Sequence, residues 1–352
     1  MTDISEIKTQ TAVVNVAGGV RFTVVTDAED RNDPVASSLM TGSFPVPDLF
    51  DPLRRAVPAG GRVLDLGAHV GSFALAAAAA GYEVVCVEAS PRNAALLRAS
   101  IELNGFTNLN LINAAISDRA GTLGFYSQGP YGHVAPQGDA GATITVEAIP
   151  VDQLMQRLGW DKVDFIKLDI EGSEVAAVRG MTNLMSQSDA PLLYCESNGH
   201  MLDVFGESPM TLKAALEGVG CELYMVEPHR LVRVRAPDLQ GQTVVDYLAV
   251  KGHHEILASG RVDSALTQAE QLAWLHRSAS SSIEPERLYA ARALRDCDHA
   301  FRSNPEAEMI RITLAKDASE HVRALAHTIP PTGVQPDATS AAAQERPWWR
   351  VW

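Results

Sequence analysis

The sequence lacks concentrated positive charge and long hydrophobic runs. Its 352 residues include 29 Lys and Arg against 43 Asp and Glu, which gives a formal net charge of −14. Because nucleic-acid binding depends on clustered Lys and Arg that neutralise phosphates, we expect no nucleic-acid partner. No stretch reaches the ~18 apolar residues that a bilayer span needs, and the N-terminal residues show no signal-peptide pattern. We therefore expect a cytoplasmic protein without a membrane partner.

Cysteines and aromatic residues are also scarce. The four cysteines, at positions 86, 195, 221 and 297, are far apart and form no Cys-x-x-Cys pair. This spacing argues against zinc and redox motifs and predicts reduced, buried thiols instead of disulfides. Hydrophobic residues make up 46% of the chain and aromatics 6%, so the chain should be globular, with one large core plus additions or with two domains.

Short apolar runs alternate with helical patterns through the middle of the chain. The predicted strands are "RVLDLG", "YEVVCVEA", "NLNLINAAIS", "VDFIKLDIEG" and "PLLYCESN". Helices are predicted between them, for example "SPRNAALLRASIELNG", in which Ser90 is the cap, Pro91 the first residue and Gly105 the stop, and "EVAAVRGMTNLM". Buried strands separated by helices are typical of a parallel sheet covered on both faces. The predicted fold class is therefore α/β, with a doubly wound, mostly parallel sheet.

The chain divides into four predicted segments. Residues 1–45 should form a β hairpin and loop, residues 46–255 the α/β domain, residues 256–328 a helical appendage, and residues 329–352 a disordered tail. Within the second segment, "CELYMVE", "RLVRVRA" and "TVVDYLAVKG" predict antiparallel strands that close the sheet at its edge. The amphipathic helices of the appendage are compatible with a homodimer that forms through them. The tail ends on three tryptophans, which would expose apolar surface unless they dock.

A glycine loop follows the first strand of the α/β domain. It reads "LDLGAHVG", with Asp65 on the strand and Gly67 and Gly71 in the turn, and Glu88 ends the next strand. Ligands of doubly wound sheets lie beyond the carboxyl ends of the strands. A dinucleotide-binding loop would read G-x-G-x-x-G, whereas here Ala and His follow Gly67 and the nearby acid would repel pyrophosphate. S-adenosylmethionine fits better, because its sulfonium and ammonium groups suit acids and its ribose diol suits Glu88.

Four segments resemble the successive motifs of the FkbM-type methyltransferases: "VLDLGAHVGSFAL", "VCVEASPRNAALLRASIELNGFTNLNLINAAISDRAGTLGFY", "VDFIKLDIEGSEVAAVRGM" and "PLLYCESN". These are class I S-adenosylmethionine enzymes that act mostly on oxygens of sugars, polyketides and other small metabolites. The resemblance covers about residues 45–252, and "IKLDIEGSE" is its most specific part. One departure is His69, where the family usually has Asn.

The resemblance implies a set of cofactor-binding residues: Asp65, Gly67, Ala68, Gly71, Glu88, Ala89, Asn113, Ala115, Asp118 and Asp169. The glycine loop and Glu88 would hold the methionine and ribose parts. Asn113, Ala115 and Asp118 would lie near adenine, where alanine at 115 implies backbone contacts to the base.

The residues that could handle a methyl acceptor follow the fourth and fifth strands: Asp169, Glu171, Glu174, Glu196, Asn198 and His200. Methyl transfer to an oxygen requires that the acceptor be aligned with the sulfonium and lose its proton. In one possible mechanism, Asp169 and Glu196, with Asn198 or Glu171, bind Mg²⁺, which lowers the pKa of the acceptor.

A second and a third mechanism need no metal. In the second, an acid, His200 or His133 is the general base; His133 lies in the glycine-rich and proline-rich loop "QGPYGHVAP". In the third, the acids only cap the following helices or bind the ammonium group of the cofactor. The sequence leaves these three mechanisms open.

The predicted function is an O-methyltransferase that acts on a hydroxyl or carboxylate of a small metabolite, a sugar or a natural product. Two competing functions belong to different classes. One is an NAD-dependent oxidoreductase, and the second is a non-catalytic scaffold whose helical tail binds a protein partner.

Overall fold

The computed structural model describes residues 4–330 apart from residues 17, 31–32, 43, 45–46, 128–131, 137–140, 228–229, 237, 240–243, 252–256, 258–261, 264–266 and 298. The prediction for the tail therefore falls, from residue 331 onward, outside the described residues. None of the helices in the described ranges is long and apolar enough to cross a membrane.

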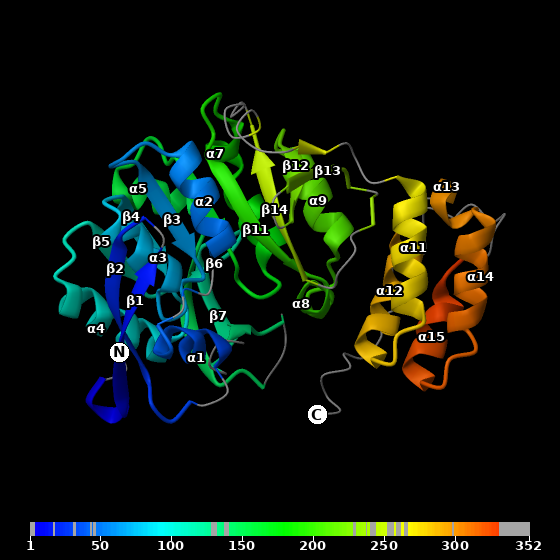
Figure 1. The fold of residues 1–352 in the computed structure, drawn as a ribbon, viewed down its shortest axis with the longest axis horizontal. Coiled ribbons are helices and arrows are strands. Elements are labelled where there is room, and N and C mark those ends of the chain that lie inside the picture. Colours follow the sequence, from blue (N-terminus) through cyan, green and yellow to red (C-terminus); the bar gives the residue numbers. More distant parts are fainter. Residues whose placement is uncertain are drawn as a thin grey trace.

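A nine-stranded sheet forms the centre of the molecule (Figure 1). In spatial order its strands are β15 (Val262–Asp263), β13 (Arg230–Val234), β12 (Glu222–Glu227), β14 (Val244–Val250), β11 (Leu192–Asn198), β10 (Phe165–Leu168), β3 (Arg62–Leu66), β4 (Glu83–Val87) and β5 (Leu109–Ile112). The five strands from β11 to β5 are parallel. From β3 the chain winds outward through β4 and β5, and from β10 it winds in the opposite direction. The predicted doubly wound α/β fold is confirmed, and its switch point lies between β3 and β10.

Helices cover both faces of this sheet. They are α2 (Pro47–Ala56), α3 (Ser72–Ala79), α4 (Pro91–Asn104), α5 (Val151–Leu158), α6 (Glu174–Arg179), α7 (Thr182–Ser186), α8 (Gly199–Val204) and α9 (Pro209–Gly218). Successive strand side chains point to opposite faces, so Val63 of β3 joins one buried cluster and Leu64 and Leu66 join the other. The sheet thus has an apolar core on each side, as continuous apolar strands predict.

The predicted N-terminal hairpin is also present, and it packs on the helices beside β3. After the short 3₁₀ helix η1 (Ile4–Glu6), β1 (Thr9–Val16) pairs antiparallel with β2 (Val20–Asp27). Asn104 of α4 accepts a hydrogen bond from the Thr23 amide at 2.7 Å and donates to the Thr23 carbonyl at 2.6 Å. Helix α1 (Pro34–Met40) follows the hairpin. An isolated hairpin is only marginally stable. These contacts with α4 attach the hairpin to the domain and stabilise it.

Three predicted elements differ in the structure. The third strand is two strands, because the chain leaves the main sheet after β5 and continues as β6 (Ala115–Ile116). Together with β7 (Gly121–Tyr126), β8 (His133–Val134) and β9 (Ile144–Ile149), β6 forms a separate four-stranded sheet. The predicted helix over residues 174–185 is broken at Gly180, where a Cβ would lie 2.3 Å from the Ser117 carbonyl oxygen. Strand β14 lies inside the sheet, antiparallel to both β11 and β12, instead of closing its edge.

The helical appendage lies beyond the β13 side of the sheet (Figure 1, yellow to red). Its helices are α11 (Gln268–Ala279), α12 (Glu284–Asp296), α13 (His299–Arg302), α14 (Pro305–Leu314) and α15 (Glu320–Thr328). Trp274, Tyr289, Leu314 and Val322 belong to a buried cluster that contains side chains of the appendage. The appendage therefore has a core of its own, separate from the two cores of the main sheet.

Candidate active site

A cavity of about 220 Å³ opens at the carboxyl ends of β3, β4, β10 and β11, on both sides of the switch point. Its lining falls into groups by element: Gly67, Ala68 and His69 after β3; Glu88 and Ala89 after β4; Lys167, Asp169, Ile170 and Glu171 on and after β10; Glu196 on β11; Pro34 and Val35 of α1; and Ala115, Ile116, Phe125 and Val134 of the small sheet. Doubly wound sheets bind their ligands at this place.

One buried ammonium group links the strand ends below this cavity. The Nζ of Lys167 on β10 donates to the Gly67 carbonyl at 2.9 Å and lies 3.4 Å from Asp65 and 3.2 Å from Asp169. Burial alone would lower the pKa of Lys167, but Asp169 and Asp65 raise it above its ordinary value. Asp65 is completely buried, and burial raises its pKa. The nearby Lys167 opposes this effect only in part. Lys167 therefore holds the glycine loop, β3 and the loop after β10 together.

The glycine loop and the loop after β10 meet too closely for side chains. Gly67 has a φ of 87°, and a Cβ there would lie 1.7 Å from the carbonyl oxygen of Asp169. The loop after β10 is organised by the buried Glu174 carboxylate, which accepts from the amides of Ile170 at 3.0 Å and Gly172 at 3.1 Å. Glu174 is thus a scaffold for the loop, and it holds Glu171 in the cavity wall with a φ of 53°. Non-glycine residues rarely adopt such a backbone, and they concentrate at functional sites.

Three acids converge on one side of the cavity. Carboxylate oxygens of Asp169, Glu171 and Glu196 all lie within 4.8 Å of one another, and each side chain is half-buried. Burial, together with the neighbouring carboxylates, raises the pKa of Glu171 to about 8 and that of Glu196 to about 10. Like charges disfavour ionisation of one another, so this cluster would be stabilised by a cation in the cavity.

Glu88 lies on the other side of β3, at the end of β4. Its two carboxylate oxygens accept from the amides of His69 and Ser90, each at 2.8 Å. Burial raises the pKa of Glu88, although these amides and the nearby His69 ring oppose the effect. The Glu88 carboxylate therefore fixes the glycine loop. Because each carboxylate oxygen can accept more than one hydrogen bond, Glu88 can also accept hydrogen bonds from a ligand in the cavity.

Not every residue that the resemblance implies reaches the cavity. Gly67, Ala68, Glu88, Ala89, Ala115 and Asp169 line it. Asp65 lies beneath the floor, and Gly71 begins α3 with a φ of 89°. Asn113 donates to the carbonyls of Glu88 at 2.7 Å and Ala89 at 3.1 Å, so it positions this loop. Asp118 is outside the lining and pairs with Arg119 at 3.4 Å.

Three residues predicted for the chemistry also lie elsewhere. Asn198 is the N-cap of α8 and accepts from the amides of His200 at 3.2 Å and Met201 at 3.3 Å, so the structure does not support it as a metal ligand. His133 stacks near Tyr126 with ring centroids 5.2 Å apart, while its neighbours Gly132 and Val134 line the cavity. The alternation of side chains along β8 therefore turns the His133 ring away.

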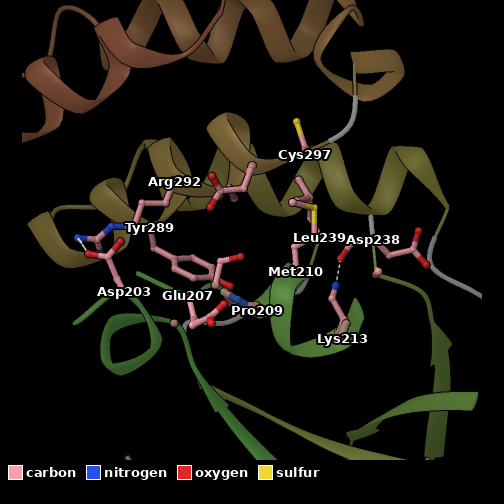
Figure 2. Close-up of a pocket in the computed structure, with 15 residues that line it drawn as sticks. Asp203, Glu207, Pro209, Met210, Lys213, Asp238, Leu239, Tyr289, Arg292 and Cys297 are labelled. Atoms are coloured by element: carbon pink, nitrogen blue, oxygen red, sulfur yellow. Dashed lines mark hydrogen bonds and ion pairs between the residues drawn. The ribbon is translucent and has the colours of Figure 1, made fainter. Parts of the chain in front are cut away.

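His200 faces the helical appendage. Its Nδ1 lies 3.4 Å from an Arg292 guanidinium nitrogen, and Arg292 pairs with Asp203 at 2.9 Å (Figure 2). Burial and the positive charge of Arg292 lower the pKa of His200. The cavity at this junction measures about 30 Å³, room for only a few water molecules. His200 is therefore outside the lining of the cavity at the strand ends, and its position does not favour the predicted role as general base.

The sequence reasoning missed Lys167 and the contribution of α1. A lysine inside an otherwise apolar strand, "FIKL", was the available signal for Lys167, since such a residue is rarely buried without a partner. The contribution of Pro34 and Val35 to the cavity had no comparable signal.

One family model matches the part of the chain that contains the loops after β3, β4 and β10. Residues 65–215 match the methyltransferase FkbM domain family. These residues are an FkbM methyltransferase domain. The matched range begins at Asp65 on β3 and ends within α9, so it contains the glycine loop, Glu88 and the three converging acids. No curated protein matches the chain.

Several solved methyltransferase structures show a distant likeness. A precorrin-6y methyltransferase of Geobacter metallireducens is 13% identical, with a TM-score of 0.34, over 58% of this chain and 86% of that chain. A 16S rRNA methyltransferase of T. thermophilus in complex with AdoMet and guanosine is 14% identical, with a TM-score of 0.37, over 69% of this chain and 50% of that chain. A TehB-like SAM-dependent methyltransferase of Corynebacterium glutamicum is 12% identical, with a TM-score of 0.34, over 61% and 93%.

The cavity of the FkbM domain fits S-adenosylmethionine, the cofactor of this family. Four carboxylates line it, against the single lysine. This surplus suits the sulfonium and ammonium groups of the cofactor and opposes the pyrophosphate of NAD.

Replacement of Lys167 tests the buried charge network. Lys167→Met should lower the free energy of unfolding by about 3–5 kcal/mol, because it leaves the buried Asp65 without its ion-pair partner. Urea denaturation measures this loss. Lys162→Met is the matched control, since Lys162 pairs with Asp164 at 3.1 Å in a half-exposed position, and it should cost less than about 1 kcal/mol. Equal losses in the two variants would contradict the structural role of Lys167.

Proposed function

We propose that the protein transfers the methyl group of S-adenosylmethionine to an oxygen of a small-molecule acceptor, a hydroxyl or a carboxylate. The observation that carries this proposal is the cluster of Asp169, Glu171 and Glu196 in the wall of the cofactor cavity. An acceptor hydroxyl must lose its proton as it is methylated, and these carboxylates lie together in the cavity wall, where one of them can accept it.

The two sides of the cavity suggest the orientation of the cofactor, which supplies an electrophilic methyl group on its sulfonium. Glu88 would accept hydrogen bonds from the ribose hydroxyls, since it ends β4 and lines the cavity. Ala115, Ile116 and Phe125 of the small sheet offer an apolar wall for adenine. The methionine part would then extend past the glycine loop toward the acids after β10 and on β11.

Glu171 is the proposed general base. Efficient general bases have pKa values near the working pH, and among the three acids Glu171 has a pKa raised to about 8. A cation bound beside the cluster would lower this raised pKa and favour the ionised form that accepts a proton. Asp169 is already paired with Lys167 at 3.2 Å, so its role is to position the loop and the acceptor.

The same oxygens could instead hold Mg²⁺, whose ligands are carboxylates and water. Assays of S-adenosylhomocysteine formation, with a panel of hydroxylated metabolites and glycosides, are therefore run with Mg²⁺ and with chelator. Activity that persists in chelator supports Glu171 as the base, whereas activity that depends on Mg²⁺ reassigns the cluster to metal binding.

Glu88→Gln tests the cofactor site. Loss of charge-assisted hydrogen bonds should cost about 1.5–3 kcal/mol, which weakens S-adenosylmethionine binding about 10- to 150-fold. Isothermal titration calorimetry measures the Kd. Glu83→Gln is the control, because Glu83 lies at the other end of β4 and pairs with the half-exposed Arg62 at 3.0 Å. An unchanged Kd for Glu88→Gln would remove Glu88 from the cofactor site.

Glu171→Gln tests the chemistry. With an acceptor identified from the panel, kcat should fall about 10²- to 10⁴-fold, while the Kd for S-adenosylmethionine changes by only a few fold. His133→Gln, whose ring lies outside the cavity lining, should keep the wild-type kcat. If Glu171→Gln also keeps it, the base is another group.

A further inference from the structure

Helix α1 forms part of the wall of the cofactor cavity and is tied to the glycine loop by a contact between Asp33 and His69. Pro34 and Val35, the first two residues of the helix, line the cavity. The N-cap residue Asp33 divides its carboxylate between two partners. One oxygen accepts from the Ala36 amide at 2.9 Å, and the other lies 3.0 Å from Nε2 of His69.

His69 joins this helix to the cofactor site. Its ring reaches Asp33, while its amide donates to the Glu88 carboxylate at 2.8 Å. The residue has a φ of 52°, a backbone conformation that few non-glycine residues adopt. The structure thus holds His69 in a strained conformation in which its two polar groups face different walls of the cavity.

The contact between Asp33 and His69 is shielded from solvent. The side chains of Asp33 and His69 are 5% and 16% exposed. Burial raises the pKa of Asp33, but His69 and the amides of α1 together lower it by more, so the net shift of this pKa is downward. The charged groups that face His69 are Asp33 from the N-cap of α1 and Glu88 from the end of β4.

Among the described residues, α1 is held by packing against the N-terminal hairpin and by the contact at its N-cap. The helix has seven residues, too short to be stable by itself in water. Its buried side chains are Ala36 and Leu39, and its N-terminal end is held by the contact between Asp33 and His69. Loss of that contact would free the end of the helix that lines the cavity.

We propose that the contact between Asp33 and His69 is a latch that holds α1 over the bound cofactor and limits the rate at which S-adenosylmethionine and S-adenosylhomocysteine leave. The inference rests on the proposed cofactor site. Asp33 is a positioning residue that acts through α1 and lies outside the cavity lining, whereas His69 joins α1 to the cavity and also lines it.

Two conservative variants isolate the latch. Asp33→Asn removes the charge but keeps a side chain that caps helices equally well. His69→Asn removes the imidazole and keeps a residue that tolerates positive φ. Asp317→Asn is the matched control, because Asp317 pairs with Arg287 at 2.8 Å in a similarly shielded position within the appendage.

Stopped-flow displacement of S-adenosylhomocysteine measures its association and dissociation rates for the wild type, both variants, the double variant and the control. The proposal predicts a dissociation rate about 10-fold faster in each single variant, with no further increase in the double variant and no change in Asp317→Asn. A purely structural role would lower the melting temperature without this specific, non-additive change in dissociation.

Wild-type dissociation rates in both single variants, or additive effects in the double variant, would overturn the latch. Absence of S-adenosylhomocysteine binding by the wild-type protein would instead overturn the cofactor site itself, so the two failures are distinguishable. If Asp33→Asn does not fold, as judged by thermal melting, His69→Asn decides the question with the same rate measurement.

Discussion

The ammonium group of Lys167 is the interaction on which the rest of the site depends. It lies at the switch point of the sheet, between Asp65 below the cavity and Asp169 in its wall, and it also holds the glycine loop by the Gly67 carbonyl. A buried charge is tolerated only when it is paired and hydrogen-bonded. The network therefore fixes the relative positions of β3 and β10, and with them the two loops that line the proposed cofactor site.

One lysine does not neutralise the acids around it. Glu88, Glu171 and Glu196 also line the cavity, and burial raises the pKa of each of them. Asp169, Glu171 and Glu196 disfavour the ionisation of one another, and a cationic ligand favours their ionised forms. In the proposed function, the same surplus of acid that suits a sulfonium cofactor provides the carboxylate that accepts a proton from the methyl acceptor. Cofactor selection and chemistry thus have one electrostatic cause.

The fold and the cofactor loops could be predicted because local sequence signals mark them. Features that depend on long-range contacts could not be predicted. Helix α4 begins and ends where its cap, its proline and Gly105 indicate, and Glu88 was found because strand ends are readable. By contrast, the chain turns away after β5 where Asn113 bonds to carbonyls 24 and 25 residues earlier. His200 is turned from the cavity by Arg292, 92 residues later. Neither partner is marked in the local sequence, so neither outcome could be predicted.

The central claim is that the acid-rich cavity binds a cation, and proton release on binding tests it most directly. Because the pKa values of Glu171 and Glu196 are raised to about 8 and about 10, both are largely protonated near pH 7, and a bound sulfonium should lower both pKa values. Proton release is measured by calorimetric titration in buffers of different ionisation enthalpy. Binding of S-adenosylmethionine should release more protons than binding of S-adenosylhomocysteine, which lacks the sulfonium charge. The preference for S-adenosylmethionine should also increase as the pH rises from about 6 to 8. Equal proton release and a preference independent of pH would contradict the account.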